Sequence, residues 1–395
     1  MQQFTSKKIF FLTENYERGG GNRYLYDLAS IAKSQGHSVT VFSNHFGLEP
    51  QEVQWFEDLK ITYRPISFMS WGELRARYKL RNNFIFKLLC RIVFLILCPL
   101  SWIFQFLLFR KILQNEKPDL IVGANGGYPG GGAVNRFILI GHLLKIPSFN
   151  SIVNIPSQEF LDQIRMLFWD QVIPYINRKI IVDSQEIIRQ LKPHGFSKEK
   201  CSLVYNGLPG TLPYQPRNNT KVRILFFARL ELIKGADVFI ESIRRLIPLH
   251  KNLLEVHIYG SGSFSETMKK LAAEFPGQVS YFGFIEGDFQ QIFSEADVYV
   301  LPSTMEGLPY TVLEAMRSGC CVVSTKVGGL PELIQDGFSG ILIHPQNPSQ
   351  LTSTLTTLIQ NPIRREQLGR AAKARFDAEF EQGSIFAKHA TLFDD

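Results

Sequence analysis

Two glutamates lie eight residues apart in the stretch EGLPYTVLEAM, on either side of a glycine-proline break. The sequence Gly307-Leu308-Pro309 predicts a helix start, so Glu306 should lie in a loop and Glu314 inside the helix, which should end at Gly319. A helix start offers backbone N–H groups to an anion, and a carboxylate can accept two hydrogen bonds from a ribose diol. This pattern suits a ligand that carries phosphate, ribose and sugar. The alternative is that Glu306 caps the helix and Glu314 pairs with a surface base.

A second candidate group lies in FFARLELIKGADVFI, between an apolar run and a helix-length segment. Arg229 and Lys234 stand on the predicted loop, and Gly235 opens the helix. An arginine can bind a diphosphate through two hydrogen bonds, and a lysine adds a point charge. The alternative is that both are solvated surface charges, as most arginines and lysines are.

Three consecutive glycines in YERGGGNRYLYDLA form a third candidate. Gly20 and Gly21 lie at a predicted strand-to-helix turn, where a missing side chain lets another molecule approach the backbone. The run is not GxGxxG, and no acidic residue ends a second strand where an NAD ribose would need one. A flexible turn is the alternative.

These residues are placed by strand-like runs that alternate with helix-length segments along the whole chain. One series begins at KIFFLT and a second at VRILFFARL. Apolar strands between helices predict parallel sheets covered on both faces, and two such series predict two Rossmann-like domains. The Pro-, Gly- and Asn-rich stretch 206–221 marks the seam. We therefore expect an α/β protein with domains at 1–206 and 207–377, whose sheets face a ligand across a cleft.

Composition narrows the possible partners. The chain has 395 residues and a net charge of +7, which is modest for this length and gives no argument for nucleic acid. An anionic membrane or a phosphorylated substrate fits such a charge equally well. The five cysteines include an adjacent pair and no CxxC, so the sequence favours a reducing compartment and predicts a cytoplasmic protein.

One segment departs from the alternating plan. Residues 92–109 read IVFLILCPLSWIFQFLLF, without a charge, and basic residues flank them on both sides. A single membrane crossing would separate strands that belong to one sheet, and Pro99 disfavours a straight helix. The segment 75–111, with its apolar part in 84–111, is therefore expected to bind a membrane surface. A buried core helix or an oligomer contact is the alternative.

Taken together, these motifs resemble the retaining nucleotide-sugar glycosyltransferases of family 4, which have the GT-B fold. The resemblance covers VYNG to GILIHP and, more loosely, the first glycine loop. It rests on the pair Glu306 and Glu314, on ARLELIKG, and on STKVGGLPELIQDGFSGILI. It implies two Rossmann-like domains and a C-terminal helix at about 378–395 that packs back on the first one.

The resemblance also implies roles for individual residues. Arg229, Lys234 and Glu306 would be catalytic: the two cations would bind the donor diphosphate, and Glu306 would face the transferred sugar. Glu314 would hold the ribose. The remaining donor contacts would come from Gly20, Gly21, Phe284, Ile285, Gly307, Leu308 and Pro309. Many relatives carry a histidine where this sequence has Asn154, so Asn154 is a candidate on the acceptor side.

The resulting hypothesis is a retaining glycosyltransferase at the cytoplasmic face of a membrane. It would move a sugar from a UDP- or GDP-linked donor to a glycan or lipid-linked acceptor in cell-surface polysaccharide or glycolipid synthesis. No cofactor is expected, and no metal, since no Asp-x-Asp stands in a plausible strand-end loop. Two alternatives remain: a non-catalytic scaffold that binds the nucleotide sugar, and a sugar-nucleotide epimerase of the same fold.

Overall fold

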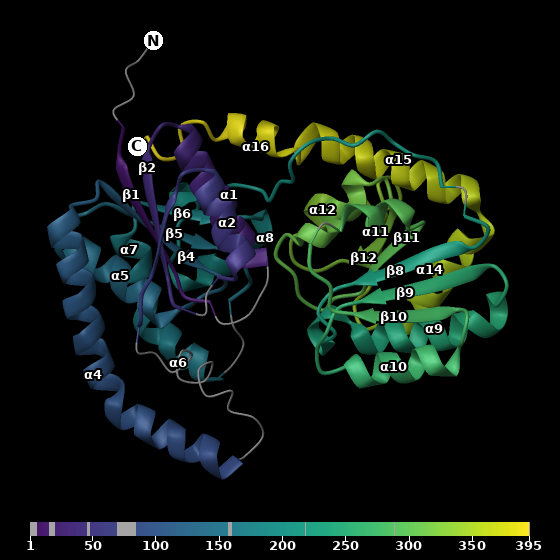
Figure 1. Ribbon diagram of the computed structural model, residues 1–395, viewed down its shortest axis with the longest axis horizontal. Helices are drawn as coiled ribbons and strands as arrows, with labels where there is room; N and C mark the ends of the chain where they lie inside the picture. Colours follow the sequence, from purple (N-terminus) through teal and green to yellow (C-terminus); the bar gives the residue numbers. More distant parts are fainter. Residues whose placement is uncertain are drawn as a thin grey trace. The chain divides into compact units, whose positions relative to one another are not determined.

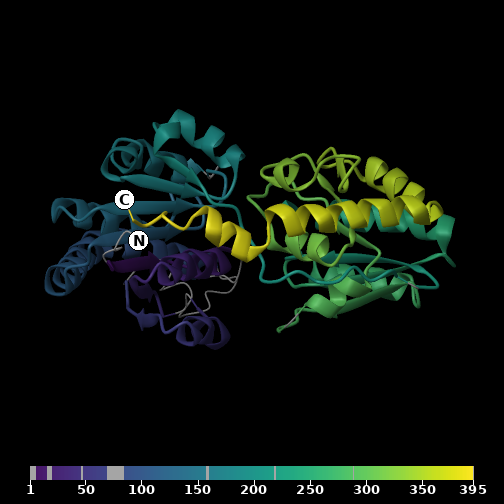
Figure 2. The same ribbon diagram turned by 90° about the horizontal axis from the view of Figure 1, so that it is seen from above.

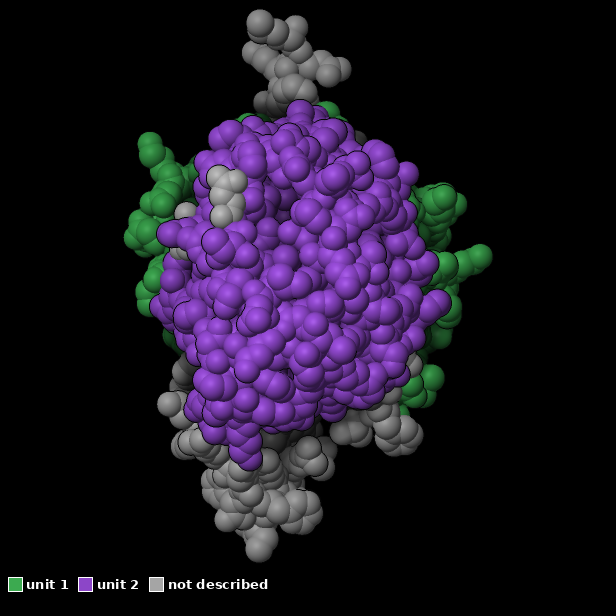
Figure 3. Space-filling view, turned by 90° about the vertical axis from the view of Figure 1, so that its right-hand side faces the viewer, with its two compact units in different colours: residues 1–204, 389–395 green, residues 205–388 purple. Residues whose placement is uncertain are grey.

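A computed structural model describes residues 6–15, 20–45, 48–68, 84–156, 160–217, 219–287 and 289–394, without the side chains of 84–99 and 160–162. The chain divides into two compact units, one formed by residues 1–204 and 389–395 and the other by residues 205–388 (Figures 1 and 3). Each unit is built on its own parallel sheet with helices on both faces.

The sheet of unit 1 has the strand order β3-β2-β1-β4-β5-β6-β7 within the described residues, and every pairing is parallel. The order reverses between β1 and β4, which makes their carboxyl ends the topological switch point of this unit. The strands are β1 (Lys8–Thr13), β2 (Ser38–Ser43), β3 (Thr62–Pro65), β4 (Leu120–Asn125), β5 (Ser148–Ile152), β6 (Lys179–Val182) and β7 (Cys201–Leu203).

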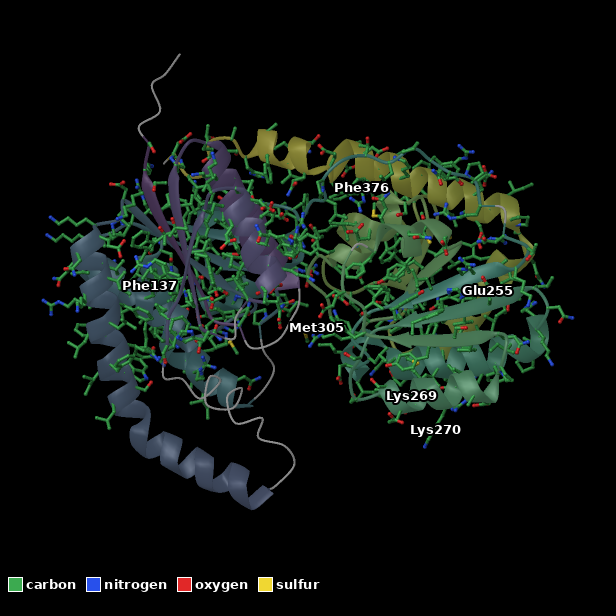
Figure 4. The ribbon with its side chains drawn as sticks, in the orientation of Figure 1. Phe137, Glu255, Lys269, Lys270, Met305 and Phe376 are labelled. Carbon is green, nitrogen blue, oxygen red and sulfur yellow. The ribbon has the colours of Figure 1, made fainter. Side chains whose placement is uncertain are left out.

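Helices cover both faces of this sheet. The core under α4 and α5 contains Phe109 and Phe137, whose rings meet edge to face at 5.3 Å (Figure 4 labels Phe137). A second core lies under α6, α7 and α8. The helices are α1 (Gly20–Ser34), α2 (Pro50–Asp58), α4 (Phe84–Glu116), α5 (Gly132–Leu143), α6 (Phe160–Trp169), α7 (Ile173–Ile176) and α8 (Gln185–Leu191), and two short 3-10 helices, η1 (Lys192–His194) and η2 (Lys198–Lys200), follow them.

The end of the chain returns to unit 1. The expected C-terminal helix is α16 (Gln382–Lys388), which belongs to unit 2, whereas residues 389–395 belong to unit 1. Phe393 is fully buried between Phe11 and Phe149, with ring centroids 5.9 and 6.0 Å away. Aromatic burial therefore fixes this segment to the first sheet.

The sheet of unit 2 has the order β10-β9-β8-β11-β12-β13, again parallel throughout the described part. Its switch point lies between β8 and β11. The strands are β8 (Val222–Phe227), β9 (Leu254–Tyr259), β10 (Val279–Gly283), β11 (Val298–Leu301), β12 (Cys321–Thr325) and β13 (Ile341–Ile343).

Two hydrophobic cores hold this second sheet. Helices α9, α10 and α14 bury one face, and α11, α12, α13 and α15 bury the other. Figure 2 shows α15 (yellow) running along unit 2. The helices are η3 (Leu232–Lys234), α9 (Ala236–His250), α10 (Ser265–Glu274), α11 (Gln290–Glu295), α12 (Tyr310–Arg317), α13 (Leu330–Leu333), α14 (Pro348–Gln360) and α15 (Pro362–Glu379).

The apolar segment forms part of α4, which continues through Pro99. The basic flank that we expected to assist it, at 75–83, lies outside the described residues. In the part of the chain that the structure describes, no helix is both long enough and apolar enough to cross a membrane.

Candidate active site

The loops that follow β8 and β11 are in direct contact at the switch point of unit 2. Gly235 has a φ of +71°, and a side-chain carbon there would lie 2.0 Å from the carbonyl oxygen of Pro302. The amide of Thr304 also donates to the carbonyl of Ile233 at 3.0 Å. Only glycine combines this backbone conformation with such a close approach. The contact brings the cation-bearing loop beside the loop that carries Glu306.

Lys234 and Glu306 form an ion pair in which both carboxylate oxygens are bound. The Lys234 Nζ lies 2.7 Å from Oε1 and 2.8 Å from Oε2 of Glu306, which is only 5% exposed. The buried hydroxyl of Ser303 donates to Oε1 at 2.6 Å. Charge-assisted hydrogen bonds are short and directional, so these contacts fix the orientation of the carboxylate.

The backbone around Glu306 is held from a third loop, the one that follows β12. Gly328 has a φ of +55°, and a side-chain carbon there would lie 1.7 Å from the carbonyl oxygen of Glu306. The amide of Gly329 donates to the carbonyl oxygen of Gly307 at 3.0 Å, and the hydroxyl of Thr325 donates to the carbonyl oxygen of Ser303 at 2.6 Å. These contacts give a reason for the two glycines of VGG after β12 in the motif STKVGGLPELIQDGFSGILI: a larger side chain at Gly328 would collide with the backbone of Glu306.

Glu314 lies inside α12, as expected, and Gly319 follows the helix with a φ of +69°. Pro309 is the N-cap and not part of the first helical turn. Glu314 Oε2 lies 2.6 Å from Nη2 of Arg317, whose Nη1 donates to the carbonyl of Pro209 at 2.9 Å. Arg317 is 8% exposed, so the partner of Glu314 is a buried arginine and not a surface base.

The other predicted donor residues lie on loops at the same edge of this sheet. Arg229 is exposed on the loop after β8, and Leu308 is buried, with Asn206 donating to its carbonyl oxygen. Phe284 and Ile285 follow the edge strand β10, and Phe284 is 52% exposed. Met305, next to Glu306, marks this edge in Figure 4. The parallel strands thus bring together residues that lie far apart in the sequence.

In unit 1, Gly20 and Gly21 begin α1, after β1. Among the described residues, the nearest atom to a side-chain carbon at Gly21 would be the Nδ2 of Asn15, 3.9 Å away. The preceding residue, Gly19, lies outside the described residues. Asn154 is exposed on the loop after β5, and Gly127 lies close to its side chain.

Sequence reasoning missed a glycine-rich loop at the switch point of unit 1. The stretch NGGYPGGG follows β4 and contains five glycines, which was the available signal. Glu14 Oε2 accepts a hydrogen bond from the amide of Ala133 in the first turn of α5 at 2.9 Å, and Asn125 Oδ1 accepts one from Gly131 at 2.9 Å. A carboxylate therefore satisfies a backbone donor at the start of this helix.

Ser303 was also missed, although the spacing Ser-x-x-Glu was visible in the sequence. Cysteine chemistry does not contribute at this site. Burial raises the pKa of the Cys320 thiol to about 12 and raises that of Cys321 as well, and both are almost completely buried. A protonated, inaccessible thiol is a poor nucleophile. Among the described residues, no three His, Cys, Asp or Glu side chains are grouped so that they could hold a metal ion.

The geometry defines what this site can do. A buried carboxylate is held in one orientation, cations lie on the adjoining loop, and glycines let the loops approach closely. Such an arrangement can hold an anionic leaving group near the cations and an electron-poor centre near the carboxylate. These are the requirements for transferring a group away from a phosphate ester.

Comparison with known proteins assigns the chain to a family. Residues 18–209 match the model of Glycosyltransferase Family 4, and residues 213–375 match that of Glycosyl transferases group 1. The chain belongs to the GT-B glycosyltransferases of the family 4 type. The expected α/β architecture of two parallel-sheet domains is thereby confirmed.

Two curated relatives illustrate the likeness. The sulfoquinovosyl transferase SQD2 of Arabidopsis thaliana is 27% identical over 65% of this chain and 53% of its own length. A D-inositol 3-phosphate glycosyltransferase of Thermomonospora curvata is 28% identical over 53% of this chain and 55% of its own. The chain thus spans about half the length of these relatives.

Solved structures agree in fold over nearly the whole chain. The crystal structure of Anabaena Alr3699/HepE in complex with UDP has a TM-score of 0.75 at 20% identity and covers 98% of this chain and 99% of that one. The sucrose-phosphate synthase of Thermosynechococcus elongatus has a TM-score of 0.73 at 15% identity, with the same 98% of this chain and 98% of its own covered.

Proposed function

We propose that this protein is a retaining glycosyltransferase that moves a sugar from a nucleoside-diphosphate sugar to a glycan or lipid-linked acceptor. The observation that carries the proposal is the ion pair between Lys234 and the buried carboxylate of Glu306 at the switch point of unit 2, completed by the hydroxyl of Ser303. Family membership supports it, and so do relatives whose names describe glycosyl transfer.

Each residue of the donor site has a stated role in this proposal. Arg229 and Lys234 bind the diphosphate and stabilise the negative charge that grows on it as the sugar departs. Glu306 faces the transferred sugar and supports positive charge at its anomeric carbon. Glu314 binds the ribose. The base lies near Phe284 and Ile285, and the chain from Gly307 to Pro309 completes the donor contacts.

Lys234 has two tasks in this arrangement, because its ammonium group already binds Glu306. It neutralises a carboxylate that would otherwise repel the diphosphate, and its remaining capacity for hydrogen bonding serves the phosphate oxygens. In unit 1, we assign Gly20 and Gly21 to phosphate contact and Asn154 to the acceptor side.

The proposal also covers the acceptor and the subcellular location of the protein. We propose that the protein works in cell-surface polysaccharide or glycolipid synthesis at the inner face of the cell membrane, which it contacts through 75–111. The exposed apolar side chains of α4 support this, as do the basic residues around them. A lipid-linked acceptor would be presented at such a surface.

The proposed reaction needs no divalent metal, because two cationic side chains supply the positive charge at the diphosphate. Transfer should proceed at an unchanged rate in excess EDTA. A rate that falls with EDTA and recovers with Mg²⁺ or Mn²⁺ would overturn this part of the proposal.

The test is sugar transfer from radiolabelled donors to a membrane lipid extract, with Lys234→Ala and Lys269→Ala as a matched pair of variants. Lys269 pairs with Glu266 at 2.6 Å on the surface of the same unit (Figure 4). We expect Lys234→Ala to lose about a hundredfold or more in rate and Lys269→Ala to stay near the wild type. Equal rates for both variants would reject the assigned site.

The same assay separates the alternative functions. An epimerase forms product from the nucleotide sugar without an acceptor, and a scaffold binds the nucleotide sugar without forming product. Retention is tested by the anomeric configuration of the glycosidic bond formed from an α-linked donor. A β-linked product would show inversion and contradict the proposal.

A further inference from the structure

One stretch of α4 is inverted relative to an ordinary surface helix. Between Leu100 and Leu107 the side chains turned into the protein are polar: Ser101 is 6% exposed and Gln105 is fully buried. The side chains turned outward are apolar: Leu100, Trp102, Ile103, Phe104, Phe106 and Leu107, which are 38–59% exposed. A helix on a water-facing surface has the opposite arrangement.

The inward polar side chains are bound, so the inversion is built into the packing. Gln105 donates to the carbonyl oxygen of Phe68 and to the hydroxyl of Ser101, and its own oxygen accepts from Arg136 of α5. The guanidinium of Arg136 also lies over the ring of Trp102, 4.4 Å from its centroid. These contacts fix the rotation of α4 and hold its apolar side chains outward.

Helix α6 adds a second outward apolar row. Ile164, Leu167 and Phe168 follow the i, i+3, i+4 spacing of one helix face and are 49%, 72% and 52% exposed. Trp169 is buried, and its ring stacks on that of Trp102 with an angle of 8° between the planes and 6.4 Å between the centroids. The two helices therefore adjoin at these two rings, and both carry outward apolar side chains.

We infer that this α4–α6 surface, made of the six named residues of α4 and the three of α6, lies on an anionic lipid bilayer. The inference rests on the proposed membrane attachment and extends it to α6, which the apolar segment of the sequence did not indicate. Aromatic and aliphatic side chains gathered on one exposed face are typical of an interfacial helix and rare on a purely water-facing surface.

Charge favours lipid over a second copy of the chain as the partner. The sequence of α4 contains four basic residues and one acidic residue, Glu116, which pairs with Lys8 and Arg64. The sequence of α6 contains one residue of each sign, Asp162 and Arg165. Arg110 and Lys111 are exposed where the outward apolar row ends, and Arg165 is exposed between the apolar residues of α6. Basic residues beside an apolar face attract anionic headgroups, whereas two copies of this surface would repel each other.

The test is flotation of the full chain with vesicles of phosphatidylglycerol and phosphatidylethanolamine, and with phosphatidylcholine vesicles for comparison. The α6 variant carries Leu167→Ser and Phe168→Ser. Its matched control carries Leu249→Ser and Ile363→Ser, which replace side chains of unit 2 that are 66% and 68% exposed. We expect the wild type and the control to bind the anionic vesicles, and the α6 variant to bind at least about tenfold more weakly.

The outcomes distinguish the role of α6 from the proposed membrane attachment through 75–111, on which this inference rests. If the α6 variant binds as the wild type does, while Ile103→Ser with Leu107→Ser abolishes binding, attachment through α4 stands and the role of α6 is rejected. If the wild type does not float with either vesicle, both are rejected. If the wild type is a dimer that the α6 variant dissociates, and vesicles bind neither, the partner is a second copy.

Fluorescence gives an independent readout of the same contact. The emission of Trp102 should shift to shorter wavelength when anionic vesicles are added, and Trp102→Phe should remove that shift. Nucleotide-dependent thermal stabilisation should be unchanged in the α6 variant, because α6 lies in unit 1 and the proposed donor residues of unit 2 are untouched. An emission spectrum of the wild type that anionic vesicles leave unchanged would contradict the inference.

Discussion

The two units contain the same kind of switch point and fill it differently. In unit 2, the carboxylate of Glu306 lies between a lysine and a buried serine, and glycines pack directly against neighbouring backbone. In unit 1, the carboxylate of Glu14 binds a helix amide, and Gly131 of the loop after β4 lies against its side chain. One fold thus supports a rigid charged centre in one unit and a helix-start contact in the other.

The difference indicates where chemistry is expected. A carboxylate bound by a lysine and a hydroxyl keeps one orientation, which a reacting centre requires. A carboxylate at a helix start satisfies a backbone donor and has a structural explanation without any ligand. The comparison therefore predicts large effects on transfer from changes around Glu306 in unit 2, and a small effect from replacing Glu14 in unit 1.

The largest effect is expected from Glu306→Gln. The substitution keeps the shape of the side chain, removes the charge at the sugar and leaves Lys234 beside a neutral amide. We expect the rate of transfer to fall by about a thousandfold. Initial rates at saturating donor measure it, and the circular dichroism spectrum checks folding. A loss of less than tenfold would remove Glu306 from the reacting centre.

Next comes a pair of glycine substitutions that compares how the two switch points are packed. Gly328→Ala puts a side-chain carbon against backbone at a positive φ, so we expect a loss of about 2–4 kcal/mol in the free energy of unfolding. Gly132→Ala, at the start of α5 after the glycine-rich loop of unit 1, meets only the guanidinium of Arg136, at 2.9 Å. That flexible side-chain end can shift, so we expect about 1 kcal/mol or less. Urea unfolding of both variants measures the two losses in the free energy of unfolding. Losses of similar size would show that the two switch points are packed equally tightly.

Ser303→Ala should have a smaller effect on catalysis. Its hydroxyl donates to Glu306 and does not itself reach the donor in our account. We expect kcat to fall by about tenfold, the equivalent of one net hydrogen bond, with KM for the donor changed by less than about twofold. Steady-state kinetics separates the two constants. A change confined to KM would assign Ser303 to donor binding instead of positioning.

The smallest effect is expected from Glu14→Ala in unit 1. The variant removes the acceptor of the Ala133 amide at the start of α5, which should cost about 0.5–1 kcal/mol of stability. The rate of transfer should remain within about threefold of the wild type. A loss as large as that of Glu306→Gln would show that the two switch points contribute equally to the reaction.

Much of this architecture could be predicted from sequence because its strands are apolar and because turn-forming residues such as glycine and proline separate them from the helices. The helix over Glu314 and its end at Gly319 follow from local signals that the structure confirms. Strand β3 could not be predicted in this way. It is a short edge strand, TYRP, with no fully buried residue, so it lacks the hydrophobic pattern on which such predictions depend.

The site was harder to predict than the strands. Sequence reasoning placed Lys234 on the diphosphate and Glu306 on the sugar, and it did not pair them. The pair depends on β8 lying beside β11 and on the close approach at Gly235, which no local pattern encodes. The contact of Glu314 with Arg317 is different, because the i, i+3 spacing on one helix was visible in the sequence.

The most direct test of the central claim is thermal stabilisation of the purified chain by UDP, GDP, ADP and CMP. Our account predicts that UDP or GDP raises the unfolding temperature and that Arg229→Ala and Glu314→Ala each abolish the rise, whereas Lys269→Ala keeps it. Stabilisation that survives in both site variants, or none with any nucleotide, would contradict a donor site at the switch point of unit 2.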